Sequence, residues 1–483
     1  MAASRCCRSS LLACVLVLVS LAPRTAPAEA LSQAELTCLF DSGDLLAGSS
    51  SAEPPPWQDV ASLSPGEASR ARLALGTAAK GFAPGVETSA LLRVELPLTG
   101  NAEDTAAGLR DVSSWLALSW RARDGVRLSL RAFPFDTDYE RLGYLHALDW
   151  GGTNVARGDS VFLRQAGGVP GVRLELDAGK VRAFVGLKWA TSSDSLGGAR
   201  RLWGALSGAS GQLSRAVRIE GGFGYFQRAS SALNRSLEPS FLEGASLRLV
   251  LHDGPAEPEL SAEPLRPPSL RDAPTLLAAP TTRGLAFALE GVVLVQRLRR
   301  FEQPGTMALV PAPAAALYGS ARGRVLAAHM ALAWRSLPFV LRNDASLANG
   351  ETLPTTALAS SELAAWLGSS ASLPLSFVPS LEVGLRLPAA LQTKSALPGF
   401  AQTLVVAGAS GLQALPVGAG RLPVVAVRVG SRFQASPQLA VALFGEYQRN
   451  PNRVTFAARV GGATRTFARP DTLAVDAVLQ ARF

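Results

Sequence analysis

The sequence is poor in cysteine and histidine, and each shortage argues against a class of function. Three of its four cysteines lie within the first fourteen residues, which leaves Cys38 alone in the rest of the chain. A lone cysteine can form no intrachain disulfide and no cysteine-based metal site. The three histidines lie far apart in the sequence, and no nucleophile motif stands beside any of them. We therefore expect a protein that is not an enzyme and that holds no metal or cofactor.

Long apolar runs are also missing beyond the N-terminus. The nearest approach to one is residues 399–420, which Pro416 and several glycines interrupt. A membrane protein built from this chain would have to be a barrel, because only helices and closed barrels satisfy the backbone in lipid. Positive charge is nearly all arginine and is scattered rather than clustered, so the sequence predicts no nucleic-acid partner.

The first residues have the pattern of a secretory signal peptide. Arg5 and Arg8 form a positive region, residues 11–21 are apolar, and small residues around Ala28 offer a cleavage site. The apolar run is too short to span a membrane as a helix. We expect residues 1–28 to be cleaved from an exported protein. A lipidated Cys14 is the alternative, although the apolar run continues past it.

From residue 88 onward, apolar and polar residues alternate in many short segments. Residues 126–132 (VRLSLRA) follow the turn-forming pair Asp124-Gly125 and place apolar and polar side chains at alternate positions. Residues 172–189 repeat this design around a turn at 177–180. A period of two puts successive side chains on opposite faces of a strand. The pattern therefore predicts many half-apolar strands joined as antiparallel hairpins.

The final segment, residues 471–483, alternates in the same way and ends on Phe483. Apolar residues occupy every second position from Leu473 to the end. This resembles the last strand of bacterial outer-membrane β-barrel proteins, in which such a terminal Phe is the assembly signal. The resemblance is porin-like and covers roughly residues 88–483. It implies a cell outer-membrane location, with membrane lipid and the barrel-assembly machinery as partners, and it leaves oligomerisation open.

We therefore predict an all-β fold, an antiparallel transmembrane β-barrel of about 16 strands, within a range of 14–18, because bacterial barrels have even strand numbers. Residues 87–483 would form the barrel. Residues 29–86 would be a separate periplasmic lead-in or a plug inside the barrel, with a helix over residues 66–80. These two alternatives remain open at this point.

Function would lie on the inner face of such a barrel. Unpaired charge in a dry core is costly, whereas a water-filled lumen tolerates it. An excess of basic residues would favour anions. The alternative is that these side chains pair with acidic ones and fill the lumen. The residues predicted to line the pore are Arg93, Arg127, Arg131, Arg173, Arg182, Lys188, Arg218, Glu220, Arg428 and Arg432.

Two connections are unusually long, and loops of this length are usually functional or disordered. Residues 134–171 carry Asp136, Asp138, Glu140 and Arg141, and we expect them to fold inward as a constriction loop. The three carboxylates could also bind Ca²⁺, but the other ligands of a calcium loop are missing. The proline-rich residues 253–283 are expected to form an extracellular loop.

The sequence thus favours an outer-membrane pore for passive diffusion of small hydrophilic solutes, with a mild preference for anions. A non-conducting barrel for export, adhesion or envelope scaffolding is the alternative. A soluble all-β protein is a third reading.

Overall fold

The structure is a computed structural model of the chain. It describes residues 33–42, 45–46, 69–80, 83–97, 110–111, 114–122, 125–135, 141–142, 148–149, 170–193, 199–228, 240–253, 283–300, 303, 306–341, 358–393, 402–406, 412–459 and 462–483. Among these residues, no helix is long and apolar enough to cross a membrane.

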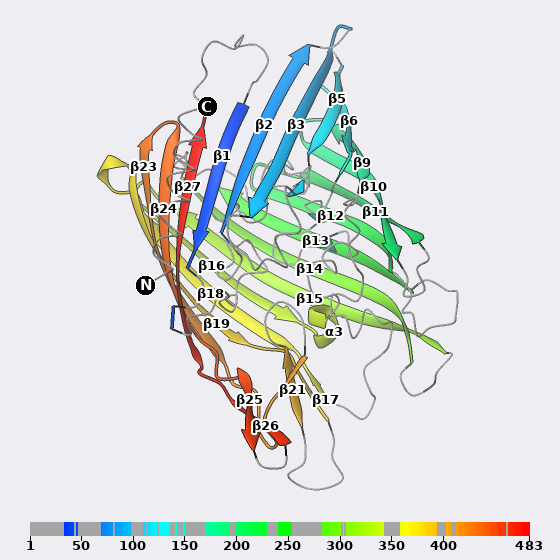
Figure 1. Cartoon of the computed structure of the whole chain (residues 1–483). Helices are drawn as coiled ribbons and strands as arrows, with labels where there is room; N and C mark the ends of the chain where they lie inside the picture. The colour runs from blue at the N-terminus through cyan, green and yellow to red at the C-terminus, as the bar shows by residue number, and fades with distance from the viewer. Residues whose placement is uncertain are drawn as a thin grey trace.

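The described strands form a closed antiparallel β-barrel of 18 strands, which is more than the predicted 16 but within the predicted range of 14–18. Each strand pairs with its neighbour along the chain, and the last strand pairs with the first (Figure 1). The wall consists of β1 (Gln33–Asp41), β2 (Arg70–Lys80), β3 (Val86–Pro97), β5 (Trp115–Arg121), β6 (Arg127–Phe133), β9 (Gly171–Asp177), β10 (Val181–Ser193), β11 (Ala199–Gln212), β12 (Val217–Arg228), β13 (Ser240–Asp253), β14 (Gly284–Arg299), β15 (Met307–Arg322), β16 (Leu326–Arg335), β18 (Glu362–Ala371), β19 (Phe377–Leu387), β23 (Val424–Ser436), β24 (Leu439–Arg449) and β27 (Asp471–Arg482).

The closing contact joins β1 to β27. Cys38 lies opposite Leu479, and Leu36 lies opposite Ala481. Closure removes the two open strand edges, whose unpaired N–H and C=O groups could not be satisfied in lipid. The barrel therefore begins before residue 87, where the sequence analysis placed its start.

The segment expected to form a helix, residues 66–80, contains β2 instead. Its alanines and leucines favour a helix locally, but β2 pairs along its whole length with β3 and with most of β1. Pairing on both sides overrides the local preference. Most of the remaining lead-in, like the signal peptide at residues 1–28, lies outside the described residues.

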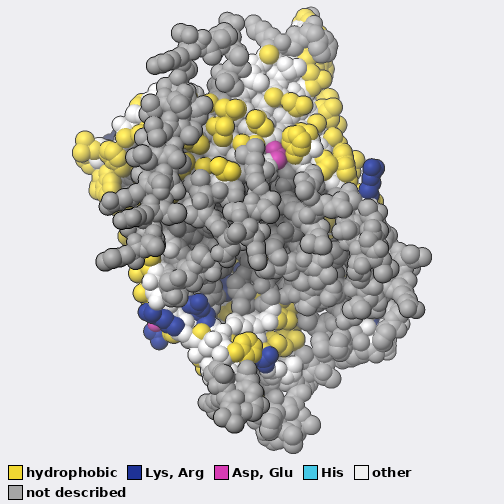
Figure 2. Space-filling view, in the orientation of Figure 1, with side chains coloured by type: hydrophobic (Ala, Val, Ile, Leu, Met, Phe, Trp, Pro, Cys, Tyr) yellow, Lys and Arg dark blue, Asp and Glu magenta, His cyan; other side chains and the backbone are white. Residues whose placement is uncertain are grey.

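The outward face of the wall is apolar. Leu247, Leu289 and Leu367 are 63%, 57% and 62% exposed, and similar side chains recur at every second position of the strands. Figure 2 shows hydrophobic side chains over much of the described surface in that view, with few charged ones among them. A surface of this kind is unfavourable in water and suits the hydrocarbon of a membrane.

The two rims of the barrel differ in their connections. One rim carries short turns, such as residues 178–180, 323–325 and 437–438, together with the end of β27. Gly125 and Gly179 adopt positive φ in two of these turns, as the predicted hairpins require. The opposite rim carries long connections, including residues 134–170, 388–423 and 450–470.

The proline-rich connection joins β13 to β14 and so leaves the wall at the short-turn rim. That rim is periplasmic in outer-membrane barrels. The residues of the predicted extracellular loop lie almost wholly outside the described ones, and their attachment to this rim argues for the opposite side.

Smaller elements accompany the wall. Near the long-connection rim, β17 (Leu358–Ser360), β20 (Ala390–Gln392), β21 (Thr403–Val406) and β22 (Leu412–Ala414) form a four-stranded sheet, and β25 (Val454–Arg459) pairs with β26 (Gly462–Phe467). Short elements are β4 (Arg110–Asp111), β7 (Arg141–Leu142), β8 (Leu148–Asp149), α3 (Leu337–Val340) and η4 (Pro374–Ser376).

Candidate functional site: the barrel interior

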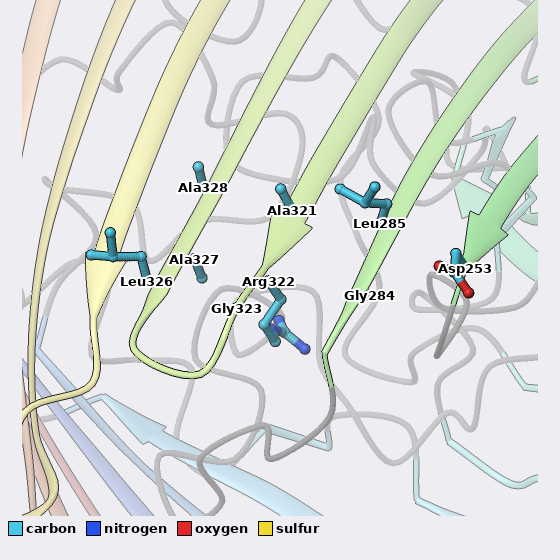
Figure 3. Close-up of a pocket in the computed structure, with 9 residues that line it drawn as sticks. All are labelled: Asp253, Gly284, Leu285, Ala321, Arg322, Gly323, Leu326, Ala327 and Ala328. Carbon is cyan, nitrogen blue, oxygen red and sulfur yellow. The ribbon is translucent and has the colours of Figure 1, made fainter.

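A surface pocket lies at the short-turn rim, between the ends of β13 and β14 and the β15–β16 turn (Figure 3). Small and apolar residues line most of it, and Asp253 and Arg322 are its charged side chains. None of the residues predicted to line a pore takes part in it. We therefore place the candidate site in the barrel interior.

All ten residues predicted to line the pore lie on the inward face of the wall. Each occupies a strand position that alternates with outward apolar residues, as Arg173 does between Val172 and Leu174. Arg173 is 3% exposed, whereas these two neighbours are 36% and 41% exposed. The alternation predicted from the sequence thus fixes which face each side chain occupies.

Basic side chains outnumber acidic ones on the described inward face. The basic ones are Arg72, Arg93, Arg121, Arg127, Arg131, Arg173, Arg182, Lys188, Arg218, Arg248, Arg322, Arg335, Arg386, Arg428, Arg432 and Arg482. The acidic ones are Glu35, Glu87, Glu175, Asp177, Glu220, Glu290, Glu362, Glu382, Glu446 and Asp476.

Many of these charges are paired, as the alternative reading expected. Glu220 on β12 forms salt bridges with Arg218 at 2.7 Å and with Arg248 of β13 at 3.0 Å. Arg173 approaches Glu175 at 2.8 Å. Because Glu220 and Arg248 are each 1% exposed, their mutual attraction is weakly screened by solvent.

Several inward arginines also lie over aromatic rings. The guanidinium carbon of Arg173 is 4.0 Å from the ring centroid of Phe184, and that of Arg131 is 4.6 Å from Trp115. Arg428 lies 4.6 Å from Phe444. Such contacts fix the planar guanidinium without neutralising its charge.

A second charged group crosses β16, β18, β19 and β23. His329 Nε2 lies 3.3 Å from Glu382 Oε1, and Arg428 Nη1 lies 3.6 Å from Glu382 Oε2. The strand between His329 and Glu382 contributes Gly368, where a side chain would collide with the imidazole ring. The missing side chain lets the histidine reach across one whole strand.

Part of the inward face is apolar, which the sequence analysis missed. Phe184, Leu206, Phe226, Leu242 and Leu294, on β10 to β14, pack into one buried cluster that extends to β15. The alternating pattern shows where these side chains point, but it does not show which inward residues face water and which are packed against one another. These inward side chains are buried against one another rather than exposed to solvent.

The helix α3 covers this apolar sector from inside the barrel. Phe339 is 1% exposed and belongs to the same cluster as Leu294, and α3 lies against β15. The inward Gln296 donates from Nε2 to the carbonyl of Pro338 at 3.2 Å. Before the helix, Arg335 donates from Nε to Glu362 at 2.7 Å. The helix α3 therefore lies on the inner side of the wall.

The connection between β19 and β23 supports α3 from the rim. Leu337, Val340 and Leu341 pack with Leu391 of β20 and Val406 of β21. Arg421 donates to the carbonyls of Ser361 and Pro388 at 2.8 and 2.7 Å, and burial lowers its pKa. The described parts of the β16–β18 and β19–β23 connections therefore pack against each other.

The predicted constriction loop falls mostly outside the described residues, including Asp136, Asp138 and Glu140. Arg141 begins β7, whose backbone lies against β12, and β8 lies against β13. These wall strands are several positions away from β6 and β9, where the loop is attached. An inward constriction by this loop stays a prediction. In the described part of the chain, no group of three or more metal-ligating side chains could hold an ion.

No family model matches the sequence, and the search of curated proteins gave no match. Solved structures of bacterial outer-membrane proteins match along most of the chain. The outer membrane protein OpdK from Pseudomonas aeruginosa is 11% identical, with 94% of this chain and 98% of that chain covered and a TM-score of 0.47. OccK9 (OpdG) from the same organism is 10% identical, with 94% and 98% covered and a TM-score of 0.48. The anion-selective porin from Comamonas acidovorans is 11% identical, with 94% and 99% covered and a TM-score of 0.39.

A closed antiparallel barrel with an even number of strands, short turns at one rim and an apolar outward face is the architecture of bacterial outer-membrane barrels. The described strands of this chain have that architecture.

Proposed function

We propose that the protein is an outer-membrane pore through which small hydrophilic solutes diffuse passively, with anions favoured over cations. The observation that carries this proposal is the excess of basic over acidic side chains on the inward face of a closed barrel. Basic rings in a pore raise the local concentration of anions and lower that of cations.

The test is single-channel recording in a planar bilayer with purified protein. Folding is checked first by the shift in gel mobility between boiled and unboiled samples. We expect discrete openings. In a KCl gradient, the reversal potential should be displaced from zero toward the equilibrium potential of chloride. Folded protein that gives no openings, or that selects cations, would contradict the proposal.

A matched pair of variants tests whether inward charge sets the selectivity. Arg432→Gln removes an inward guanidinium from β23, whereas Arg215→Gln removes an exposed one from the β11–β12 turn. We expect the first to reduce anion preference and the second to leave it unchanged.

A non-conducting barrel for export, adhesion or scaffolding is the second candidate. The apolar cluster around Phe339 favours it, because this sector of the lumen is packed with side chains. Silent bilayers from correctly folded protein would support this candidate over the pore.

A further inference from the structure

A row of aromatic side chains crosses the outward face of the barrel toward the long-connection rim. Trp189 of β10 and Trp203 of β11 lie opposite each other and are 42% and 48% exposed. The Trp203 ring centroid lies 4.8 Å from that of Tyr225 on β12. Tyr225 stacks on Phe241 of β13 with a centroid separation of 5.7 Å. Four adjacent strands thus present one continuous aromatic surface.

Two basic side chains accompany this row, one beyond its β13 end and one on β11. The guanidinium carbon of Arg297, on β14, lies 5.7 Å from the Phe241 centroid. Arg201 precedes Trp203 by two residues on the same outward face and is exposed. Glu243 shares the outward face of β13, so one carboxylate accompanies two guanidinium groups.

The row lies at the boundary between the apolar wall and the long-connection rim. Toward the other rim, the outward side chains of β13 become apolar, as Leu247 and Leu249 show. Tryptophan and tyrosine prefer such an interface because their rings are apolar at one end and polar at the other. The long-connection rim of an outer-membrane barrel faces the outside, so the row meets the outer leaflet.

We propose that this row, with Arg201 and Arg297, binds the headgroup of a phosphorylated glycolipid of the outer leaflet. The guanidinium fork matches phosphate oxygens, and flat aromatic faces suit the apolar faces of sugar rings. Arg201 and Arg297 are three strands apart, which corresponds to about 14 Å. That spacing suits a large headgroup with a phosphate at each end better than the single phosphate of a glycerophospholipid.

The experiment measures how much lipid the folded barrel retains in mild detergent, by native mass spectrometry. The probes are bisphosphorylated lipid A, its dephosphorylated form and phosphatidylglycerol. We expect the wild-type protein to retain the bisphosphorylated glycolipid roughly tenfold better than either other lipid. Equal retention of the dephosphorylated form, or of phosphatidylglycerol, would overturn the assignment.

A pair of double variants locates the site. R201Q/R297Q should lose most of the preference for the bisphosphorylated glycolipid. R215Q/R324Q, which removes the same charge from exposed turns at the opposite rim, should keep it. An equal loss in both variants would show diffuse charge attraction and sink the proposal. The gel-mobility shift establishes that each variant is folded, and the wild-type comparison of lipids stands without any variant.

Discussion

Glu220 is the carboxylate on which two guanidinium groups converge inside the barrel. Arg218 and Arg248 both approach it within 3.0 Å, and all three side chains are almost fully buried. Glu220→Gln would leave two buried cations with weaker compensation. We expect a loss of about 3 kcal/mol in the free energy of unfolding, measured by denaturant titration in lipid vesicles.

Glu87→Gln is the matched control for this variant. Glu87 pairs with Arg127 at 3.8 Å, but both side chains are more than two-fifths exposed. An exposed pair is screened by solvent, so the change in stability should stay below about 1 kcal/mol. Similar losses in both variants would show that the buried salt bridges of Glu220 stabilise the barrel no more than the exposed pair of Glu87 does.

At the level of single positions, the inward residues could be predicted because the period of two is independent of tertiary context. Arg173 and Arg218 were assigned to the correct face from their neighbours alone. The partners of the inward residues could not be predicted in the same way. The contact between His329 and Glu382 crosses Gly368 on a third strand, and no local pattern fixes the registers of three separate segments.

Among the elements, α3 makes the sharpest prediction about conduction. Phe339 fills the apolar sector beneath the β16–β18 connection, so Phe339→Ala should widen the lumen and increase single-channel conductance. The control is Phe287→Ala on the outward face of β14, which removes the same ring from the lipid side. An unchanged conductance in Phe339→Ala would show that α3 does not narrow the path.

The loop at residues 134–171 makes a competing prediction. If it constricts the pore, its removal should raise conductance in the same assay. A rise with the loop deletion but none with Phe339→Ala would assign the narrowest point to the loop, and the reverse result would assign it to α3.

Sequence patterns identified the long-connection elements least well. α3 has only four residues, which is too short for a helical period to be recognised. Its apolar side chains are buried by residues of the wall that are distant in the sequence. β2 was missed for the opposite reason. Arg70 and Arg72 do alternate with Leu73 and Leu75, but the alanines and leucines also favour a helix, and that local propensity was given the greater weight.

At the scale of the whole molecule, the barrel depends on the pairing of β1 with β27. The backbone N–H of Phe483 donates to Ala34 at 2.8 Å, and Arg482 lies 3.2 Å from Glu35. The terminal residue that resembles an assembly signal thus also takes part in closure. The sequence indicated this strand but not its partner, because β1 lies more than 400 residues away and such a pairing has no local signature.

Deletion of residues 33–41 tests this closure. Without β1, the edges of β2 and β27 would be left with unpaired backbone groups, each costly in lipid. We expect the deletion to abolish the shift in gel mobility between boiled and unboiled samples and to leave the protein sensitive to protease. If the N-terminal region were a plug or a lead-in, the same deletion would leave a folded barrel with the normal mobility shift, so that outcome would contradict the observed closure.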